Sequence, residues 1–199
     1  MQPLELYIHI PFCVKKCAYC DFLSGPAGEK EKEEYVKMLV DEIRNCPDTV
    51  QNYRVISIFF GGGTPSLLTG EQIGRLMDTV REIFTLDEDA EITMEMNPGT
   101  VTEEKLRKYR QAGVNRLSIG LQSVNDEELR LLGRIHTYEE FLEAADTDLF
   151  EKYKLLGKKL DPVTGAELKS WYDIYCQIGG YPSVVREYLS SKSMERARS

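Results

Sequence analysis

The sequence lacks the features that mark secreted, membrane-spanning or nucleic-acid-binding proteins. It has no run of 18 apolar residues and therefore predicts no transmembrane helix. The N-terminus lacks a basic stretch followed by an apolar core, which argues against a secretory signal. A net charge of −8 disfavours sequence-independent binding of nucleic acid. Together these absences predict a cytoplasmic protein.

Cysteine is scarce and unevenly distributed. Three of the five cysteines, Cys13, Cys17 and Cys20, lie within eight residues, whereas Cys46 and Cys176 stand alone. An odd number of cysteines in a chain expected to be cytoplasmic argues against a disulfide framework. The cluster of three favours a metal or iron–sulfur site.

Extended and helical patterns alternate along the first three quarters of the chain. Strands are predicted at residues 4–10, 54–60, 91–96 and 115–121, and helices at about 30–46, 71–84 and 102–113, then from Asn125 and from Thr137. Such alternation is typical of an α/β fold with parallel strands and right-handed crossovers. The polar and glycine-rich segments follow the strands, where α/β folds place their ligands.

The cysteine loop has the spacing C-x3-C-x2-C. Three thiolates can hold three corners of a [4Fe–4S] cluster and leave one iron open to another ligand. Zinc, which usually takes four protein ligands in structural sites, and reduced cysteines without metal are the alternatives. His9 is the nearest candidate for a fourth zinc ligand, although it is equally explained as a hydrogen-bonded core residue.

This loop resembles that of the radical-SAM superfamily. The wider string, Tyr-Ile-His-Ile-Pro-Phe-Cys at residues 7–13 with Cys-Asp-Phe at 20–22, is similar to a narrower group. That group contains oxygen-independent coproporphyrinogen III dehydrogenase and its HemW haem-chaperone branch. The dehydrogenase has a fourth cysteine two residues after the third, where this chain has Phe22. The resemblance therefore favours the haem-chaperone branch.

The resemblance implies the front part of a partial (β/α) TIM-like barrel, with a [4Fe–4S] cluster on the three cysteines and S-adenosylmethionine against it. It also implies possible partners: haem, a haem-accepting protein and an electron donor. Whether such a chain is an enzyme stays open. The alternatives are an oxidoreductase of the dehydrogenase type in porphyrin biosynthesis and an inactive truncated or fused fragment.

Residues outside the cysteine loop match family positions that bind S-adenosylmethionine. The glycine triplet at 61–63 would let the backbone approach a ligand closely, and an acidic side chain at a strand end could accept its hydrogen bonds. Ser118, Gly120 and Gln122 are predicted to share one strand face by their period of two, and Arg134 is expected on the following helix. The expected cofactor-binding residues are Tyr7, Tyr19, Gly62, Gly63, Thr64, Glu95, Gln122 and Arg134.

Each of these positions also has a structural explanation. The glycines could simply form a tight turn, Glu95 could be a solvated carboxylate, and Arg134 a solvated helix residue. Tyr7 and Tyr19 could be core side chains.

The resemblance ends near residue 144. We expect residues 1–145 to be a truncated radical-SAM core, residues 146–190 a helical segment, and residues 191–199 a polar tail. Residues 166–189 faintly resemble a helical segment of AAA-type ATPases, but the chain has no G-x4-G-K-[ST] loop, so nucleotide hydrolysis is not supported. A truncated or fused reading frame is expected, with a helical cap on the open barrel edge as the alternative.

Overall fold

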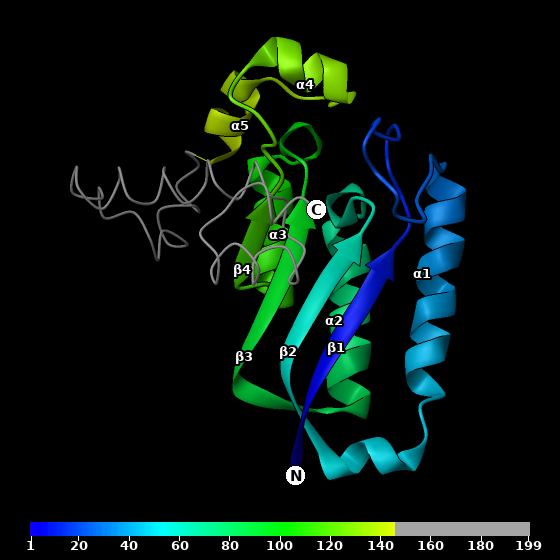
Figure 1. The fold of residues 1–199 in the computed structure, drawn as a ribbon. Coiled ribbons are helices and arrows are strands. Elements are labelled where there is room, and N and C mark those ends of the chain that lie inside the picture. The colour runs from blue at the N-terminus through cyan, green and yellow to red at the C-terminus, as the bar shows by residue number, and fades with distance from the viewer. Residues whose placement is uncertain (146–199) are drawn as a thin grey trace, which may run out of the picture. The chain divides into compact units, whose positions relative to one another are not determined.

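A computed structural model describes residues 1–145 of the chain (Figure 1). The predicted helical segment 146–190, the polar tail 191–199 and Cys176 lie outside these residues. No helix of the described part is long and apolar enough to cross a membrane.

The described residues form a parallel sheet whose strands follow one another in chain order. The strands are β1 (Gln2–Ile10), β2 (Tyr53–Gly62), β3 (Thr85–Met96) and β4 (Arg116–Ile119). Every neighbouring pair is parallel, so all four strands end at the same edge of the sheet. This arrangement confirms the α/β prediction.

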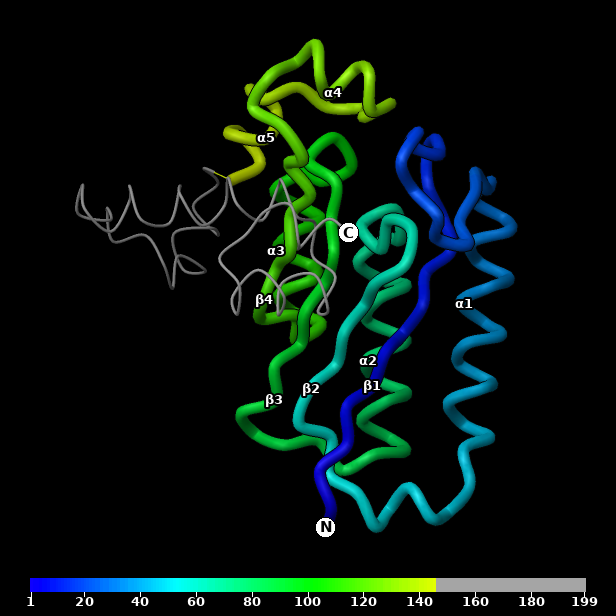
Figure 2. The backbone as a smooth tube through the Cα atoms, viewed as in Figure 1, coloured from blue at the N-terminus to red at the C-terminus, as the bar shows by residue number. Residues whose placement is uncertain are grey.

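Helices connect the strands and cover one face of the sheet (Figures 1 and 2). They are α1 (Glu29–Arg44), α2 (Gly70–Ile83) and α3 (Glu103–Ala112). Two shorter helices, α4 (Asp126–Leu132) and α5 (Tyr138–Ala145), lie beyond the carboxyl end of the sheet (Figure 1). Within residues 1–145 there are also three 3-10 turns: Asp48–Asn52, Pro65–Leu67 and Pro98–Thr100.

The apolar core lies between the sheet and these helices. Ile58 and Phe60 of β2 and Leu76 of α2 are almost wholly buried. Ile56 is 36% exposed and Phe59 is only partly buried, so the prediction that the apolar run at 54–60 is covered on both faces is wrong for the described residues. Tyr109 of α3 is also buried, and its hydroxyl donates to the Leu68 carbonyl oxygen at 2.6 Å. This bond ties α3 to the segment that follows the glycine triplet.

Helix boundaries agree with the capping residues of the sequence. The Asn125 side chain accepts from the Glu127 N–H at the start of α4, as predicted. Thr137 and Glu140 exchange the two bonds of a capping box before α5. Gly113 ends α3 in the left-handed conformation, with φ 113°.

Several strand boundaries differ from the prediction by one or two residues, and the start of β3 differs by six. β3 begins at Thr85 instead of residue 91, because Thr85 and Leu86 pair with Arg54 and Val55 of β2 despite the acidic residues that follow. β4 ends at Ile119 instead of residue 121. In the described part of the chain β4 pairs only with β3, so its outer edge has no partner strand there.

Candidate functional site

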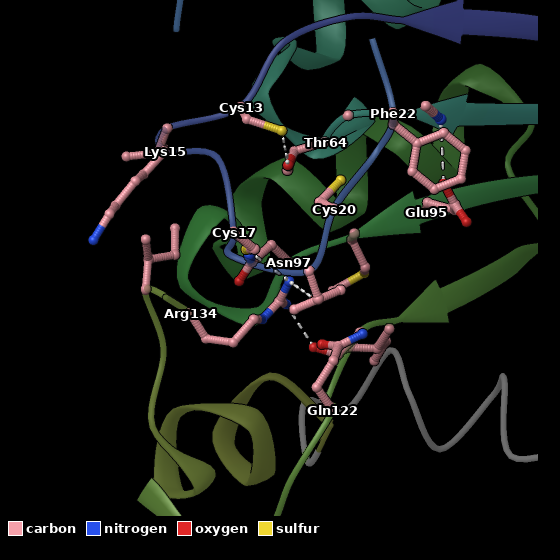
Figure 3. A pocket seen from close by; sticks show the side chains of 18 of the residues that line it. Cys13, Lys15, Cys17, Cys20, Phe22, Thr64, Glu95, Asn97, Gln122 and Arg134 are labelled. Atoms are coloured by element: carbon pink, nitrogen blue, oxygen red, sulfur yellow. Dashed lines mark hydrogen bonds between the residues drawn. The ribbon is translucent and has the colours of Figure 1, made fainter. Parts of the chain in front are cut away.

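The loops at the carboxyl ends of the four strands enclose a cavity of about 310 Å³ (Figure 3). This volume is at the lower end of the range typical of small-molecule sites. All three clustered cysteines line the cavity. The other lining residues are Val14, Lys15, Tyr19, Phe22, Gly62, Gly63, Thr64, Glu95, Met96, Asn97, Ser118, Ile119, Gly120, Gln122, Arg134 and Ile135.

The cysteine loop is held at its base and at its far side. At the base, Phe12 bridges Gly25, and the Cys13 N–H donates to the Gly25 carbonyl oxygen at 2.9 Å. At the far side, the Ala18 N–H donates to the carbonyl oxygen of Leu132, the last residue of α4, at 3.0 Å. The loop that carries the cysteines is therefore fixed to both sides of the cavity.

The cysteine side chains are partly buried and have weak partners. The Cys13 Sγ lies 3.5 Å from the Thr64 hydroxyl, and the Cys17 Sγ lies 3.8 Å from the Gly133 carbonyl oxygen. Within residues 1–145, no three histidine, cysteine or acidic side chains converge on one ion position. Three thiols around one cavity are the donor set that a cubane cluster takes, with each thiolate on a different iron.

The glycine triplet packs directly against the cysteine loop and strand β1. Gly62 has a φ of 111°, and a Cβ there would lie 2.5 Å from the His9 ring. A Cβ on Gly63 would lie 2.5 Å from the Phe12 carbonyl oxygen. The next backbone N–H, that of Thr64, donates to this same oxygen at 2.7 Å. Both glycines are therefore required sterically at this junction.

Glu95 holds its carboxylate beside the glycine turn. The Gly62 N–H donates to the Glu95 Oε2 at 3.3 Å. Partial burial raises the pKa of Glu95, and the bond from Gly62 opposes that rise. Glu95 is therefore partly buried and lines the cavity, as a binding residue would, whereas the alternative is a fully solvated carboxylate.

Arg134 lies in the connection after α4, not on a helix as predicted. Gly133 ends that helix in the left-handed conformation, with φ 77°, and turns the chain toward the cavity. The Arg134 Nη2 donates to the Gly120 carbonyl oxygen at 2.7 Å, and Nη1 donates to the Tyr19 hydroxyl at 3.4 Å. Its Nε is buried, and the described residues offer it no acceptor. A buried N–H group without an acceptor in a cavity wall is suited to donate to a bound ligand.

Gln122 lines the cavity from a position beyond the end of β4, which strand periodicity does not predict. The Gly120 N–H still bonds to the Met96 carbonyl oxygen, but Gln122 has a φ of 67° and lies beyond the end of β4. The prediction that Ser118, Gly120 and Gln122 share one strand face is therefore wrong in its geometry. All three residues nevertheless line the cavity.

The two tyrosines differ in position. Tyr19 lines the cavity beside Arg134. Tyr7 is not among the lining residues: it is 57% exposed, stacks on Phe59 and shares a hydrogen bond with the His9 ring at 3.2 Å. Core packing, the alternative for Tyr7, is therefore wrong.

Asn97 belongs to a polar segment that follows a predicted strand, but the sequence assigned it no binding role; the structure places it in the cavity lining. One residue beside the cavity was not predicted from the sequence. His136 is buried and contacts Arg134 and Asn97. Its position two residues after Arg134 was the only signal in the sequence, because no strand or helix pattern includes it.

The fold defines an α/β protein with a cavity at the carboxyl ends of its parallel strands. Residues 7–147 match the Radical SAM superfamily, and the chain belongs to that family. The family implies a [4Fe–4S] cluster and S-adenosylmethionine.

The similar proteins are longer than this chain. It is 51% identical over 146 residues to the haem chaperone HemW of Escherichia coli K12. The matched region covers 73% of this chain and 39% of that protein. It is 42% identical over 137 residues to "Radical S-adenosyl methionine domain-containing protein 1, mitochondrial" of Mus musculus, covering 69% of this chain and 31% of that protein. The chain thus spans less than half the length of these relatives.

A solved structure supports the fold assignment. Coproporphyrinogen III oxidase (HemN) from Escherichia coli, described as a radical SAM enzyme, superposes with a TM-score of 0.70 at 35% identity. The match covers 76% of this chain and 35% of that one. The parallel sheet is therefore the front part of the partial TIM-like barrel that the sequence predicted.

Proposed function

We propose that Cys13, Cys17 and Cys20 bind the [4Fe–4S] cluster, that S-adenosylmethionine occupies the same cavity, and that the protein serves haem trafficking. Three thiols and a set of polar groups line the same cavity, and this arrangement is the main support for the proposal. The orphaned Arg134 Nε and the two sterically required glycines suit a bound ligand.

The groups that line the cavity would bind and orient S-adenosylmethionine in different ways. The glycine turn brings backbone groups close to the ligand. Glu95 accepts hydrogen bonds from ligand N–H or O–H groups, and Arg134 and Gln122 fix its orientation. Tyr19 covers the cavity beside Arg134. When both cofactors are bound and an external donor has reduced the cluster by one electron, that electron would cleave the sulfonium C–S bond to give methionine and a 5′-deoxyadenosyl radical.

Haem trafficking is preferred to porphyrinogen oxidation because of the residue after the cysteine loop. Relatives named haem chaperones match at 51% and 42% identity. Phe22, which lines the cavity, stands where the dehydrogenase resemblance requires a further cysteine. The structural similarity to HemN keeps a porphyrinogen oxidoreductase as the second candidate.

Anaerobic reconstitution of the full chain with iron and sulfide tests the cofactor proposal. We expect about four irons per chain, and an electron paramagnetic resonance signal that changes when S-adenosylmethionine is added. Cys17→Ser should abolish cluster assembly. Cys46→Ser is the matched control, because Cys46 is also partly buried but does not line the cavity. Failure of the wild-type chain to assemble a cluster would mean an inactive fragment.

Haem titration separates the two candidate functions. Stoichiometric haem uptake by the reconstituted chain, without decarboxylation of coproporphyrinogen III, is the expected result for haem trafficking. Decarboxylated porphyrinogen in the product mixture would favour the oxidoreductase instead. Absence of both haem uptake and decarboxylation would remove the haem-trafficking proposal while leaving the cofactor site to be judged by reconstitution.

A further inference from the structure

His136 forms a buried connection between the end of β3 and Arg134. The side chain is only 4% exposed. Its Nδ1 lies 3.1 Å from the Asn97 side-chain oxygen and 3.4 Å from the Arg134 Nη2. Its Nε2 lies 3.2 Å from the Leu121 carbonyl oxygen. Three segments that border the cavity therefore meet at one imidazole ring.

The partners of the ring determine where its proton lies. A carbonyl oxygen only accepts, so the bond to Leu121 requires a proton on Nε2. A guanidinium only donates, so the contact with Arg134 requires a lone pair on Nδ1. The two ends of the Asn97 amide are nearly identical in shape, and rotation of the amide lets its NH₂ group donate to Nδ1. With the amide rotated in this way, a neutral ring with its proton on Nε2 suits all three partners, because Arg134 and Asn97 then share the one lone pair of Nδ1.

The other protonation states leave unfavourable contacts. A ring protonated only on Nδ1 would point its N–H at the Arg134 guanidinium and its Nε2 lone pair at the Leu121 carbonyl. An imidazolium would place a second buried cation beside Arg134. Burial and the charge of Arg134 both lower the pKa of His136, while the bond to Leu121 and the charges of Glu140 and Asp126 raise it less. The ring is therefore neutral at pH 7.

We propose that neutral His136 is a positioning residue, which holds the Arg134 guanidinium in the cavity wall by accepting its hydrogen bond at Nδ1. Gly120 fixes the same Nη2 from the other side, at 2.7 Å. With Nη2 held by these two acceptors, the unpartnered Nε stays in the cavity wall. The ligand part of this inference rests on the proposed function; the proton assignment does not.

Nuclear magnetic resonance of the cofactor-free chain tests the proton assignment. The chain has two histidines, so a His9→Gln variant assigns the ¹⁵N-labelled ring signals of His136 by elimination. We expect the neutral Nε2–H form at pH 7 and protonation only below the ordinary histidine value of 6.5. A Nδ1–H tautomer or an imidazolium at pH 7 would overturn the proposal, whatever the cofactor experiments show.

Binding of S-adenosylmethionine to the cluster-loaded chain tests the positioning role. His136→Ala should weaken this binding about tenfold without changing iron content. His136→Gln, which keeps a neutral acceptor, should recover most of the loss. Tyr138→Phe is the neighbouring control, since its ring contact with Phe141 survives the change. Wild-type affinity in His136→Ala would refute the positioning role, whereas no binding by the wild-type chain would refute the proposed function.

The pH profile distinguishes positioning from simple packing. As the pH falls through the lowered pKa of His136, Nδ1 gains a proton and can no longer accept from Arg134. Wild-type affinity should therefore fall in that range, below pH 6.5, and the affinity of His136→Gln should not show the same step. Matching profiles for the two proteins would show that the imidazole proton does not control Arg134. If His136→Ala does not fold, this comparison still decides the proposal.

Discussion

Glu95 is a carboxylate held partly buried without an ion pair among the described residues. The Gly62 N–H donates to this carboxylate, and burial raises the pKa of Glu95. A raised carboxyl pKa means that the folded state binds protons more tightly than the unfolded state. Ionised Glu95 therefore costs stability above its ordinary pKa of 4.5, and that cost is absent at lower pH. Such a residue is better explained by ligand binding than by folding.

The substitution Glu95→Gln should separate these two effects. The amide keeps the shape and one acceptor oxygen but removes the charge. At pH 7 we expect the cofactor-free protein to gain about 0.5 kcal/mol in free energy of unfolding, a small value because partial exposure screens the charge. Affinity for S-adenosylmethionine should fall about tenfold, since bonds to charged groups are stronger than neutral ones.

Thermal unfolding at pH 7 and pH 4 and equilibrium binding measure both parts of this prediction. The stability gain should shrink at the lower pH, where the carboxyl is protonated in both states. A variant that loses stability at pH 7 while binding the ligand normally would show that Glu95 is a structural residue.

At the scale of elements, the site depends on the junction between the end of β2 and the cysteine loop. Backbone groups make this junction: the Gly63 N–H donates to the Ile10 carbonyl oxygen at 2.8 Å, and the Thr64 N–H donates to that of Phe12 at 2.7 Å. The loop base is closed by the bond from Cys13 to Gly25. The position of Cys13 is therefore determined by how closely two backbones approach.

The substitution Gly63→Ala should separate these backbones. Its Cβ would lie 2.5 Å from the Phe12 oxygen and 3.0 Å from the Phe12 nitrogen, so the backbone itself must shift. We expect a loss of about 1–3 kcal/mol in stability and reduced iron content after reconstitution. Gly74→Ala is the matched control: no atom lies within 4 Å of its Cβ, and it lies inside α2. That change should stabilise the protein by about 0.5–1 kcal/mol.

Chemical denaturation and iron analysis of both variants provide the measurement. The prediction would be contradicted by equal iron content and equal stability in the two proteins, because the backbone junction would then tolerate a side chain.

At the scale of the whole molecule, the cavity walls come from separate parts of the chain. The cysteine loop, the ends of β2 and β3, and the segment around Arg134 all border it. The described residues cover the front part of the barrel, and the chain spans 39% of the length of its Escherichia coli relative. A ligand that contacts several walls at once stabilises the folded state by mass action.

Cofactor removal should therefore lower the melting temperature in steps. The cluster-loaded chain with S-adenosylmethionine at 100 times its dissociation constant should be about 2.7 kcal/mol more stable than the loaded chain without it. Removal of the cluster by chelation or oxygen should lower the stability further and abolish the effect of added S-adenosylmethionine. Anaerobic differential scanning calorimetry measures the three states. An equal response of loaded and cluster-free protein would show that the ligand does not require the cluster.

Local sequence features were sufficient to predict most of the fold. The sequence predicted the strand at 54–60 and the helix starts at Asn125 and Thr137. Each of these features depends on neighbours within a few residues along the chain. The start of β3 was missed because Thr85 is in a strand only through its pairing with β2. The position of Arg134 was missed because the left-handed turn at Gly133 depends on packing against the cysteine loop, whose Cys17 Cα lies near Gly133.

The sequence by itself determined the chemistry that this protein can offer: three closely spaced thiols, a glycine turn and polar residues after successive strands. Those properties are local, since each depends on residue type and spacing. Only the tertiary structure decided which of these groups lie side by side, because they belong to loops that follow different strands. It brought Asn97 to the cavity, placed His136 against Arg134 and Asn97, and left Tyr7 outside the cavity wall. The proton on His136 follows from partners that are 39 and 15 residues away along the chain.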